Sequence, residues 1–169
     1  MWLDNTTFKQ VVNSTPLISI DLVIENPQGQ ILLGQRVNPP AQNFWFVPGG
    51  RIQKNETLDQ AYTRLTQAEL GYALQRQQAD FLGVYEHLYP DSIFTDAVPA
   101  ISTHYVVLAY YLRLDESALQ HLPTEQHSDY RWWSKTDMQN SALVHANTRA
   151  YLPALTARMA ALKSNRMTP

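Results

Sequence analysis

The sequence contains no cysteine, no long apolar run and no marked excess of charge of either sign. The missing cysteines exclude disulfide bonds, thiolate metal sites and a cysteine nucleophile. No apolar stretch reaches about 18 residues, the length of a membrane-spanning helix, so we expect no membrane partner. A net charge of −2 without a Lys/Arg cluster argues against a nucleic-acid partner. The first ten residues, MWLDNTTFKQ, lack the features of a signal peptide, so we expect a cytoplasmic protein.

The length and composition are those of one folded unit. The chain has 169 residues, of which 44% are hydrophobic and 17% charged, as in ordinary globular proteins. We therefore expect a single domain over residues 1–169.

The sequence predicts strands and helices in mixed order. Apolar and polar residues alternate over 17–25, NPQGQ is typical of a turn, and ILLGQR resumes the strand, which predicts a hairpin over 17–36. Segment 37–50, with three prolines and paired glycines, is predicted to be a loop. Further elements are expected as follows: strands at 79–89, 102–114 and 129–134, a helix at 57–70, and one or two helices within 143–163. This order indicates an α/β (α+β) fold with helices packed against a sheet.

The helix predicted at 57–70 carries a carboxylate in its apolar face. Thr57 and Gln60 have the spacing of a capping box, and Gly71 follows the helix as a C-cap. Glu69 falls inside the apolar stripe, whereas Thr66 and Gln67 are expected to point away from it; the stripe consists of Leu58, Ala61, Tyr62, Leu65 and Ala68. A buried carboxylate requires a cation or several donors, so Glu69 is either a metal ligand or half of a structural ion pair.

The residues around this helix resemble the Nudix box. Gly50, Glu56, Arg64, Glu69 and Gly71 have the family's spacing, and FVPGG and ILLGQR fit the same family. The resemblance implies the Nudix fold, a mixed β-sheet sandwiched between α-helices. Two positions depart from the pattern, because Leu65 and Ala68 stand where the family has glutamates. Nudix enzymes use that group of carboxylates to hold several divalent ions, so this chain is expected to hold one.

Other segments are similar to one Nudix subfamily, the GDP-mannose mannosyl hydrolases, which cleave at the sugar carbon. They are RLTQAELG, STPLISID, PPAQNFWFVPGGRIQK, STHYVVL, EQHSDYRWW and VHANTRAY. The resemblance implies Mg²⁺-dependent hydrolysis of GDP-mannose, or another GDP-hexose such as GDP-glucose, to GDP and free sugar with inversion. It also implies one Mg²⁺ per subunit, replaceable by Mn²⁺, and a homodimer. Two alternatives stay open: a Nudix pyrophosphohydrolase that attacks phosphorus, and a non-catalytic nucleotide-sugar-binding protein.

The resemblance assigns a metal site and a general base. It implies that Glu69, the Gly49 carbonyl and the Gln126 side chain bind the ion. For Gln126 the alternative is a surface amide, and Glu56 is expected to support the loop and the helix start. His127 is the implied base, because an ordinary imidazole is partly neutral at physiological pH and can accept a proton.

Three arginines are expected to hold the diphosphate as bidentate donors: Arg36, Arg51 and Arg64. Arg36 ends a predicted strand, and Arg51 follows the paired glycines. Arg64 has a second interpretation, in which it braces the loop through a salt bridge to Glu56.

The remaining assignments concern the sugar and the nucleoside. The resemblance implies that Asp21 hydrogen-bonds a sugar hydroxyl, the alternative being an exposed strand residue. His87 is expected either to contact substrate or to be structural. Tyr105 is expected to face the cleft in place of its neighbour His104. In subfamily members the amino-terminal segment helps to build the nucleotide site of the neighbouring subunit, which implies substrate contacts for Trp2 and Phe8; core packing is the alternative. The loop over 90–102 is expected to act as a lid.

Overall fold

A mixed sheet forms the centre of the computed structural model, which describes residues 3–115, 122–123 and 127–165. The strand order is β3-β2-β1-β6-β5, with β4 paired to β1 and β7 to β2. The central pair, β1 and β6, is parallel, and the other pairs are antiparallel. The strands are β1 (Leu17–Glu25), β2 (Ile31–Arg36), β3 (Trp45–Phe46), β4 (Gly49–Arg51), β5 (Asp80–Tyr89), β6 (Thr103–Arg113) and β7 (His127–Trp133).

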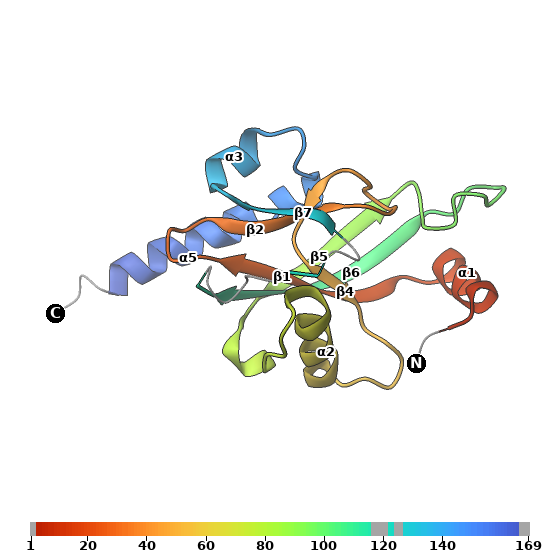
Figure 1. Cartoon of the computed structure of the whole chain (residues 1–169), viewed down its shortest axis with the longest axis horizontal. Helices are drawn as coiled ribbons and strands as arrows, with labels where there is room; N and C mark the ends of the chain where they lie inside the picture. The colour runs from red at the N-terminus through yellow and green to blue at the C-terminus, as the bar shows by residue number, and fades with distance from the viewer. Residues whose placement is uncertain (1–2, 116–121, 124–126, 166–169) are drawn as a thin grey trace.

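Helices cover both faces of this sheet, which confirms the predicted Nudix sandwich (Figure 1). On one face α2 packs through Tyr62 and Leu65 against apolar residues of β1, β2 and β6. On the other face α5 packs through Leu152 and Leu155, with Met138 of α3. The helices are α1 (Asn5–Ser14), α2 (Leu58–Leu70), α3 (Lys135–Asn140), α4 (Ala146–Arg149) and α5 (Leu152–Asn165), and a 3₁₀ turn, η1, spans Arg76–Gln78.

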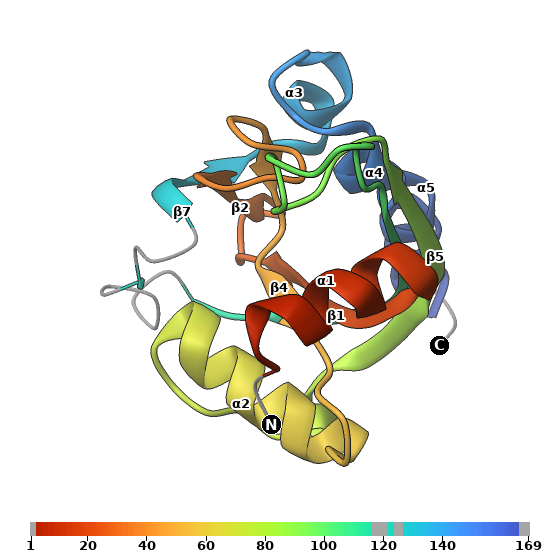
Figure 2. The same ribbon diagram turned by 90° about the vertical axis from the view of Figure 1, so that its right-hand side faces the viewer.

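The helix α1 was not predicted from the sequence. It lies across the end of the sheet where β1 begins (Figure 2). Val12 of α1 packs with Leu17 and with Ile101 of the β5–β6 loop, and Phe8 meets Phe94 of that loop edge to face at 5.8 Å. The helix and the loop are therefore packed against each other beside the sheet.

The structure confirms most of the predicted elements and corrects three details. One is the apolar stripe of α2, which is narrower than predicted because Leu58 and Ala68 are exposed. The hairpin, the strands β5 and β6, and α2 with its capping box and left-handed Gly71 C-cap all form as expected. Segment 37–50 is not entirely loop, because it contains β3 and the start of β4. Thr66 does not point away from the core: it is fully buried, and its hydroxyl donates to Tyr62 O and accepts from Leu74 N.

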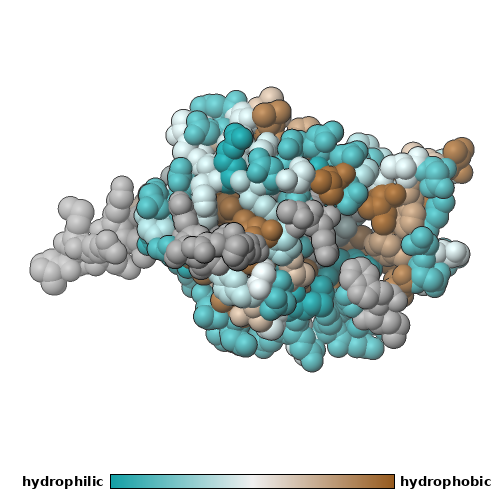
Figure 3. All heavy atoms as spheres, viewed as in Figure 1, coloured by the Kyte–Doolittle hydropathy of each residue, from teal (hydrophilic) through white to brown (hydrophobic). Residues whose placement is uncertain are grey.

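Polar groups dominate the surface seen in Figure 3, where the apolar side chains occur in separate small groups. Within the described ranges, no helix combines the length and apolar character needed to cross a membrane.

Candidate functional site

A cleft of about 270 Å³ opens where β1, β2, β4, β5 and β6 come together beside α1. Seven of the predicted metal, catalytic and substrate-binding residues line it: Phe8, Asp21, Arg36, Gly49, Arg51, His87 and Tyr105. They come from α1 and five different strands, so the folded sheet brings together residues that are far apart in the chain. His104 is not among the lining residues.

One buried group is built from Glu69 and His127, which are not among the cleft-lining residues; His127 pairs with Arg36, which does line the cleft. Glu69 lies on α2 and is only 2% exposed, as its place in the apolar stripe predicted. His127 begins β7, is 1% exposed, and places its Nδ1 3.8 Å from Glu69 Oε2. The Gly34 Cα lies so close to this ring that a Cβ there would be 2.4 Å from it, so Gly34 makes room for His127.

The hydrogen bonds of Tyr130 define the state of His127. The Tyr130 hydroxyl donates to Pro123 O at 2.8 Å and lies 3.2 Å from His127 Nδ1. Because that hydroxyl proton is already used, Nδ1 must donate, which leaves Nε2 without a proton. This Nε2 is buried and has no hydrogen-bond partner within the described part of the chain. Burial and the charge of Arg36 lower the pKa of His127 to about 4, so the ring is neutral at physiological pH.

Two guanidinium groups border the cleft. The Arg36 guanidinium lies 5.7 Å from the Phe46 ring centre, and its buried Nε donates to no group among the described residues. Arg51 stacks on Phe8 at 4.1 Å, and burial lowers its pKa. Buried or half-buried guanidinium groups with unused donors are suited to an anion such as a diphosphate.

Arg64 does not line the cleft and is held by Glu56. Its Nε and Nη2 donate to the Glu56 carboxylate at 2.5 and 2.9 Å, and Nη2 also donates to Arg51 O at 2.9 Å. Glu56 in turn accepts from Gln53 N at 2.8 Å. This clamp fixes the loop between β4 and α2, an arrangement that corresponds to the second interpretation of Arg64. Direct contact between Arg64 and the diphosphate stays a prediction.

A second polar group lies at Asp21. The Tyr151 hydroxyl donates to Asp21 Oδ2 at 2.7 Å and lies 3.3 Å from His87 Nε2. Burial raises the pKa of Asp21 to about 6, although the bond from Tyr151 and the charge of Arg36 oppose the shift. Burial and the charge of His145 lower the pKa of His87 to about 4. Asp21 is 7% and His87 3% exposed, so Asp21 is not the exposed strand residue of the alternative interpretation.

The sequence interpretation missed both tyrosines of these groups. Tyr130 lies three residues after His127, and Tyr151 ends the quoted segment VHANTRAY, but neither position shows from spacing alone that its hydroxyl reaches a cleft residue. Trp2 and Gln126 lie outside the described residues, so the structure gives no position for them.

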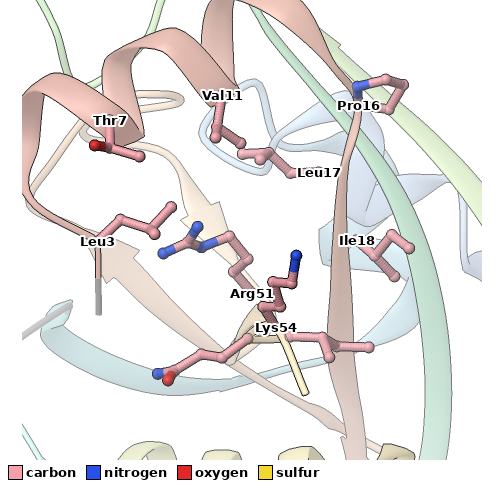
Figure 4. Close-up of a pocket in the computed structure, with 10 residues that line it drawn as sticks. Leu3, Thr7, Val11, Pro16, Leu17, Ile18, Arg51 and Lys54 are labelled. Atoms are coloured by element: carbon pink, nitrogen blue, oxygen red, sulfur yellow. The ribbon is translucent and has the colours of Figure 1, made fainter. Parts of the chain in front are cut away.

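A second cavity, of about 450 Å³, adjoins the cleft at Arg51. Its walls come from α1, the start of β1 and the segment after β4, and the side chains of Arg51 and Lys54 point into it (Figure 4). Leu3, Val11 and Ile18 give it a largely apolar lining.

A family model, described as the NUDIX domain, matches residues 15–155. The chain belongs to the Nudix family. The curated Low-salt glycan biosynthesis protein Agl8 of Haloferax volcanii is 41% identical over 113 residues, which are 67% of this chain and 69% of that protein. A Nudix hydrolase acts on a nucleotide derivative and in general uses a divalent metal ion such as Mg²⁺.

Solved structures share the Nudix fold at low sequence identity. A MutT protein from Methanosarcina mazei Go1 is 17% identical with a TM-score of 0.65, covering 86% of this chain and 97% of its own. A MutT NUDIX hydrolase from Burkholderia pseudomallei is 24% identical with a TM-score of 0.64, covering 83% and 98%. The NUDIX domain of Shewanella oneidensis NrtR, solved with ADP ribose, is 20% identical with a TM-score of 0.62, covering 93% and 94%. These likenesses show the fold alone.

Proposed function

We propose that this Nudix hydrolase converts GDP-mannose into GDP and free mannose by attack of water at the anomeric carbon with inversion, and that GDP-glucose is a further substrate. The observation that carries the proposal is the set of groups beside the cleft. One buried box carboxylate, Glu69, lies next to a neutral histidine, while two positions where the family has glutamates hold Leu65, packed in the core, and Ala68, which is exposed. The relative Agl8 carries a name in glycan biosynthesis, which agrees with a sugar-containing substrate.

The diphosphate would lie between Arg36 and Arg51. Arg36 has an unused donor, and Arg51 is fixed from its backbone by the Glu56–Arg64 clamp. Positive groups in a partly desolvated cleft stabilise the charge that develops on a departing diphosphate. Because that leaving group is already a weak base, the reaction does not need the carboxylic acid that glycosidases supply to protonate theirs.

The chemistry of the proposed donors suits a divalent ion. Glu69 has a buried carboxylate, Gly49 a backbone carbonyl at the cleft, and Gln126, outside the described residues, an amide oxygen; all are the hard oxygen ligands that Mg²⁺ prefers. Among the described residues, no group of three or more His, Cys, Asp or Glu is placed to hold a metal. The proposed ion would therefore take few protein carboxylates and fill its coordination with water and phosphate. The bound ion would supply charge neutralisation to the leaving diphosphate.

His127 would remove the proton from the attacking water. Its Nδ1–H is held by Tyr130, so Nε2 carries the free lone pair, and the ring is neutral. The nearby Glu69 carboxylate, 3.8 Å from Nδ1, would stabilise the imidazolium formed when Nε2 takes up the proton.

The sugar would lie against Asp21, with His87 and Tyr105 beside it, because all three line the cleft and Tyr151 links Asp21 to His87. Asp21 can accept a hydrogen bond from a sugar hydroxyl through its carboxylate. The nucleoside would extend past Arg51, which stacks on the cleft residue Phe8, into the adjoining apolar cavity.

The position of bond cleavage tests the proposal. The purified protein is incubated with Mg²⁺ and each of GDP-mannose, GDP-glucose and GDP-fucose in ¹⁸O-labelled water, and the products are identified by mass spectrometry. We expect the label in the free sugar and unlabelled GDP. Labelled GMP or sugar phosphate would instead show attack at phosphorus, and tight binding without turnover would show a nucleotide-sugar-binding protein. Homodimer formation stays a prediction that sedimentation of the same preparation can test.

A further inference from the structure

Tyr151 lies beneath the cleft, between two of the residues that line it. It directly precedes α5, is fully buried, and is not among the cleft-lining residues. Its hydroxyl is within hydrogen-bonding distance of both Asp21 Oδ2 and His87 Nε2. Its ring is fixed by Tyr85, which packs on it edge to face with ring centres 4.6 Å apart.

The chemistry of Tyr151, Asp21 and His87 determines which group donates in each hydrogen bond. An ionised carboxylate only accepts hydrogen bonds, so the single proton of the Tyr151 hydroxyl goes to Asp21. The contact with His87 then requires the imidazole to donate from Nε2 to the tyrosine oxygen. A neutral imidazole that donates from Nε2 carries its lone pair on Nδ1. The bonds therefore run from His87 to Tyr151 to Asp21.

We propose that Tyr151 is a positioning residue, which fixes the carboxylate orientation of Asp21 and the Nε2–H tautomer of His87 so that both present acceptors to the sugar. The proposal rests on the proposed function in placing the sugar at this end of the cleft. A phenylalanine would keep the ring packing but leave Asp21 without this donor and His87 without this acceptor. Because buried polar groups strongly favour satisfied arrangements, both side chains would then be free to adopt other orientations or protonation.

The first test measures the tautomer of His87 and needs no substrate. Full-length protein labelled with ¹⁵N-histidine is examined at pH 7 by long-range ¹H–¹⁵N NMR, with the His87 signals assigned from a His87→Gln sample. We expect protonated Nε2 and unprotonated Nδ1 in the wild type, and a shift toward Nδ1–H or a mixture in Tyr151→Phe. Tyr85→Phe, which removes a hydroxyl from the ring packed on Tyr151, should leave the pattern unchanged. A wild-type His87 protonated on Nδ1 would overturn the proposal even if Tyr151→Phe fails to fold.

The second test separates positioning of the sugar from general stability. In Tyr151→Phe, KM for GDP-mannose should rise by about tenfold, the equivalent of one hydrogen bond to a charged group. Affinity for GDP, which lacks the sugar, should stay at the wild-type value, and Tyr85→Phe should behave like the wild type. Equal weakening of GDP and GDP-mannose, or an unchanged KM, would contradict the sugar-positioning role. If the ¹⁸O experiment shows that GDP-mannose is not the substrate, the NMR result still decides whether Tyr151 sets the His87 tautomer.

Discussion

Two buried histidine–tyrosine pairs lie in and beside the cleft, and they differ in where the tyrosine proton goes. At His127 the hydroxyl of Tyr130 donates to a neutral carbonyl, Pro123 O. At His87 the hydroxyl of Tyr151 donates to a carboxylate, Asp21 Oδ2. Both imidazoles must therefore donate to their tyrosine, but through opposite nitrogens: Nδ1 in His127 and Nε2 in His87.

Because of this difference, the two histidine–tyrosine pairs are suited to different tasks. The His127 pair leaves Nε2 unpartnered among the described residues, while Nδ1 lies 3.8 Å from Glu69 Oε2, which suits proton removal from water. The His87 pair ends on a cleft-lining carboxylate, which suits recognition of hydroxyl groups. Burial lowers the pKa of both histidines to about 4, so both start neutral, and their surroundings, not their charge, distinguish them. Substitutions at the two ends should therefore act on different kinetic constants.

The largest effect is expected from His127→Gln. Loss of a general base should lower kcat by about 10²–10⁴-fold while substrate binding changes little. Steady-state kinetics over a range of pH measures both constants. His104→Gln is the matched control, since His104 does not line the cleft, and it should retain wild-type activity. An unchanged pH–rate profile in His127→Gln would remove this residue from the mechanism.

Glu69→Gln should act on metal affinity at the same end of the cleft. A neutral amide replaces the anionic ligand, so Mg²⁺ or Mn²⁺ should bind more than about tenfold more weakly. Calorimetric titration with Mn²⁺ in the presence of GDP measures the change. Glu86→Gln, at an exposed position on β5, provides the same chemical change away from the cleft and should bind Mn²⁺ normally. Wild-type metal affinity in Glu69→Gln would exclude its role as a ligand.

Tyr130→Phe tests the contrast between the two pairs directly. Without the hydroxyl, His127 loses the acceptor that holds its Nδ1 proton, and kcat should fall by about tenfold at unchanged KM. Tyr151→Phe is expected to do the reverse, raising KM more than it lowers kcat. Steady-state measurement of kcat and KM for Tyr130→Phe and Tyr151→Phe tests this contrast. The contrast would be lost if the two substitutions changed the same constant in the same proportion.

The elements that were predicted correctly from the sequence are those that depend on local contacts. The alternation over residues 17–25, the capping box at Thr57 and the Gly71 C-cap all reflect contacts within a few residues, and each is present. The burial of Glu69 also follows from helical periodicity. The helix α1 was missed although it carries a local signal, the N-cap Asp4, whose carboxylate accepts from Thr7 N at 3.0 Å. Its contacts with a distant loop, such as Phe8 with Phe94, are not visible in the sequence.

The same distinction between local patterns and contacts of distant segments applies to the functional residues. The box and the cleft-lining residues could be found because they match a family pattern. Tyr151 could not, because it is 130 residues from Asp21 in the chain and meets it only when α5 packs on the sheet. Thr66 was placed on the wrong side for a related reason: its hydroxyl accepts from Leu74 N, after the end of the helix, so the buried polar group has a hydrogen-bond partner that the helical pattern does not show.

The smallest effect is expected at the clamp that holds Arg51 between the two ends of the cleft. Arg64 and the Gln53 N–H lower the pKa of Glu56 below its usual 4.5, so the charged form is stabilised by folding. The stabilisation is then present above pH 4.5 and is lost as the pH falls through the lower, folded-state value. Glu56→Gln should lower the free energy of unfolding at pH 7 by about 1–2 kcal/mol, as expected for a partly buried bidentate pair. Below pH 4.5 the free energies of unfolding of the variant and the wild type should become more similar. Urea unfolding at several pH values measures it, with Asp59→Asn as the control because the Asp59–Arg76 pair is more exposed and should cost less. A loss that is independent of pH, or no larger than that of Asp59→Asn, would mean that the charge of Glu56 does not hold this loop.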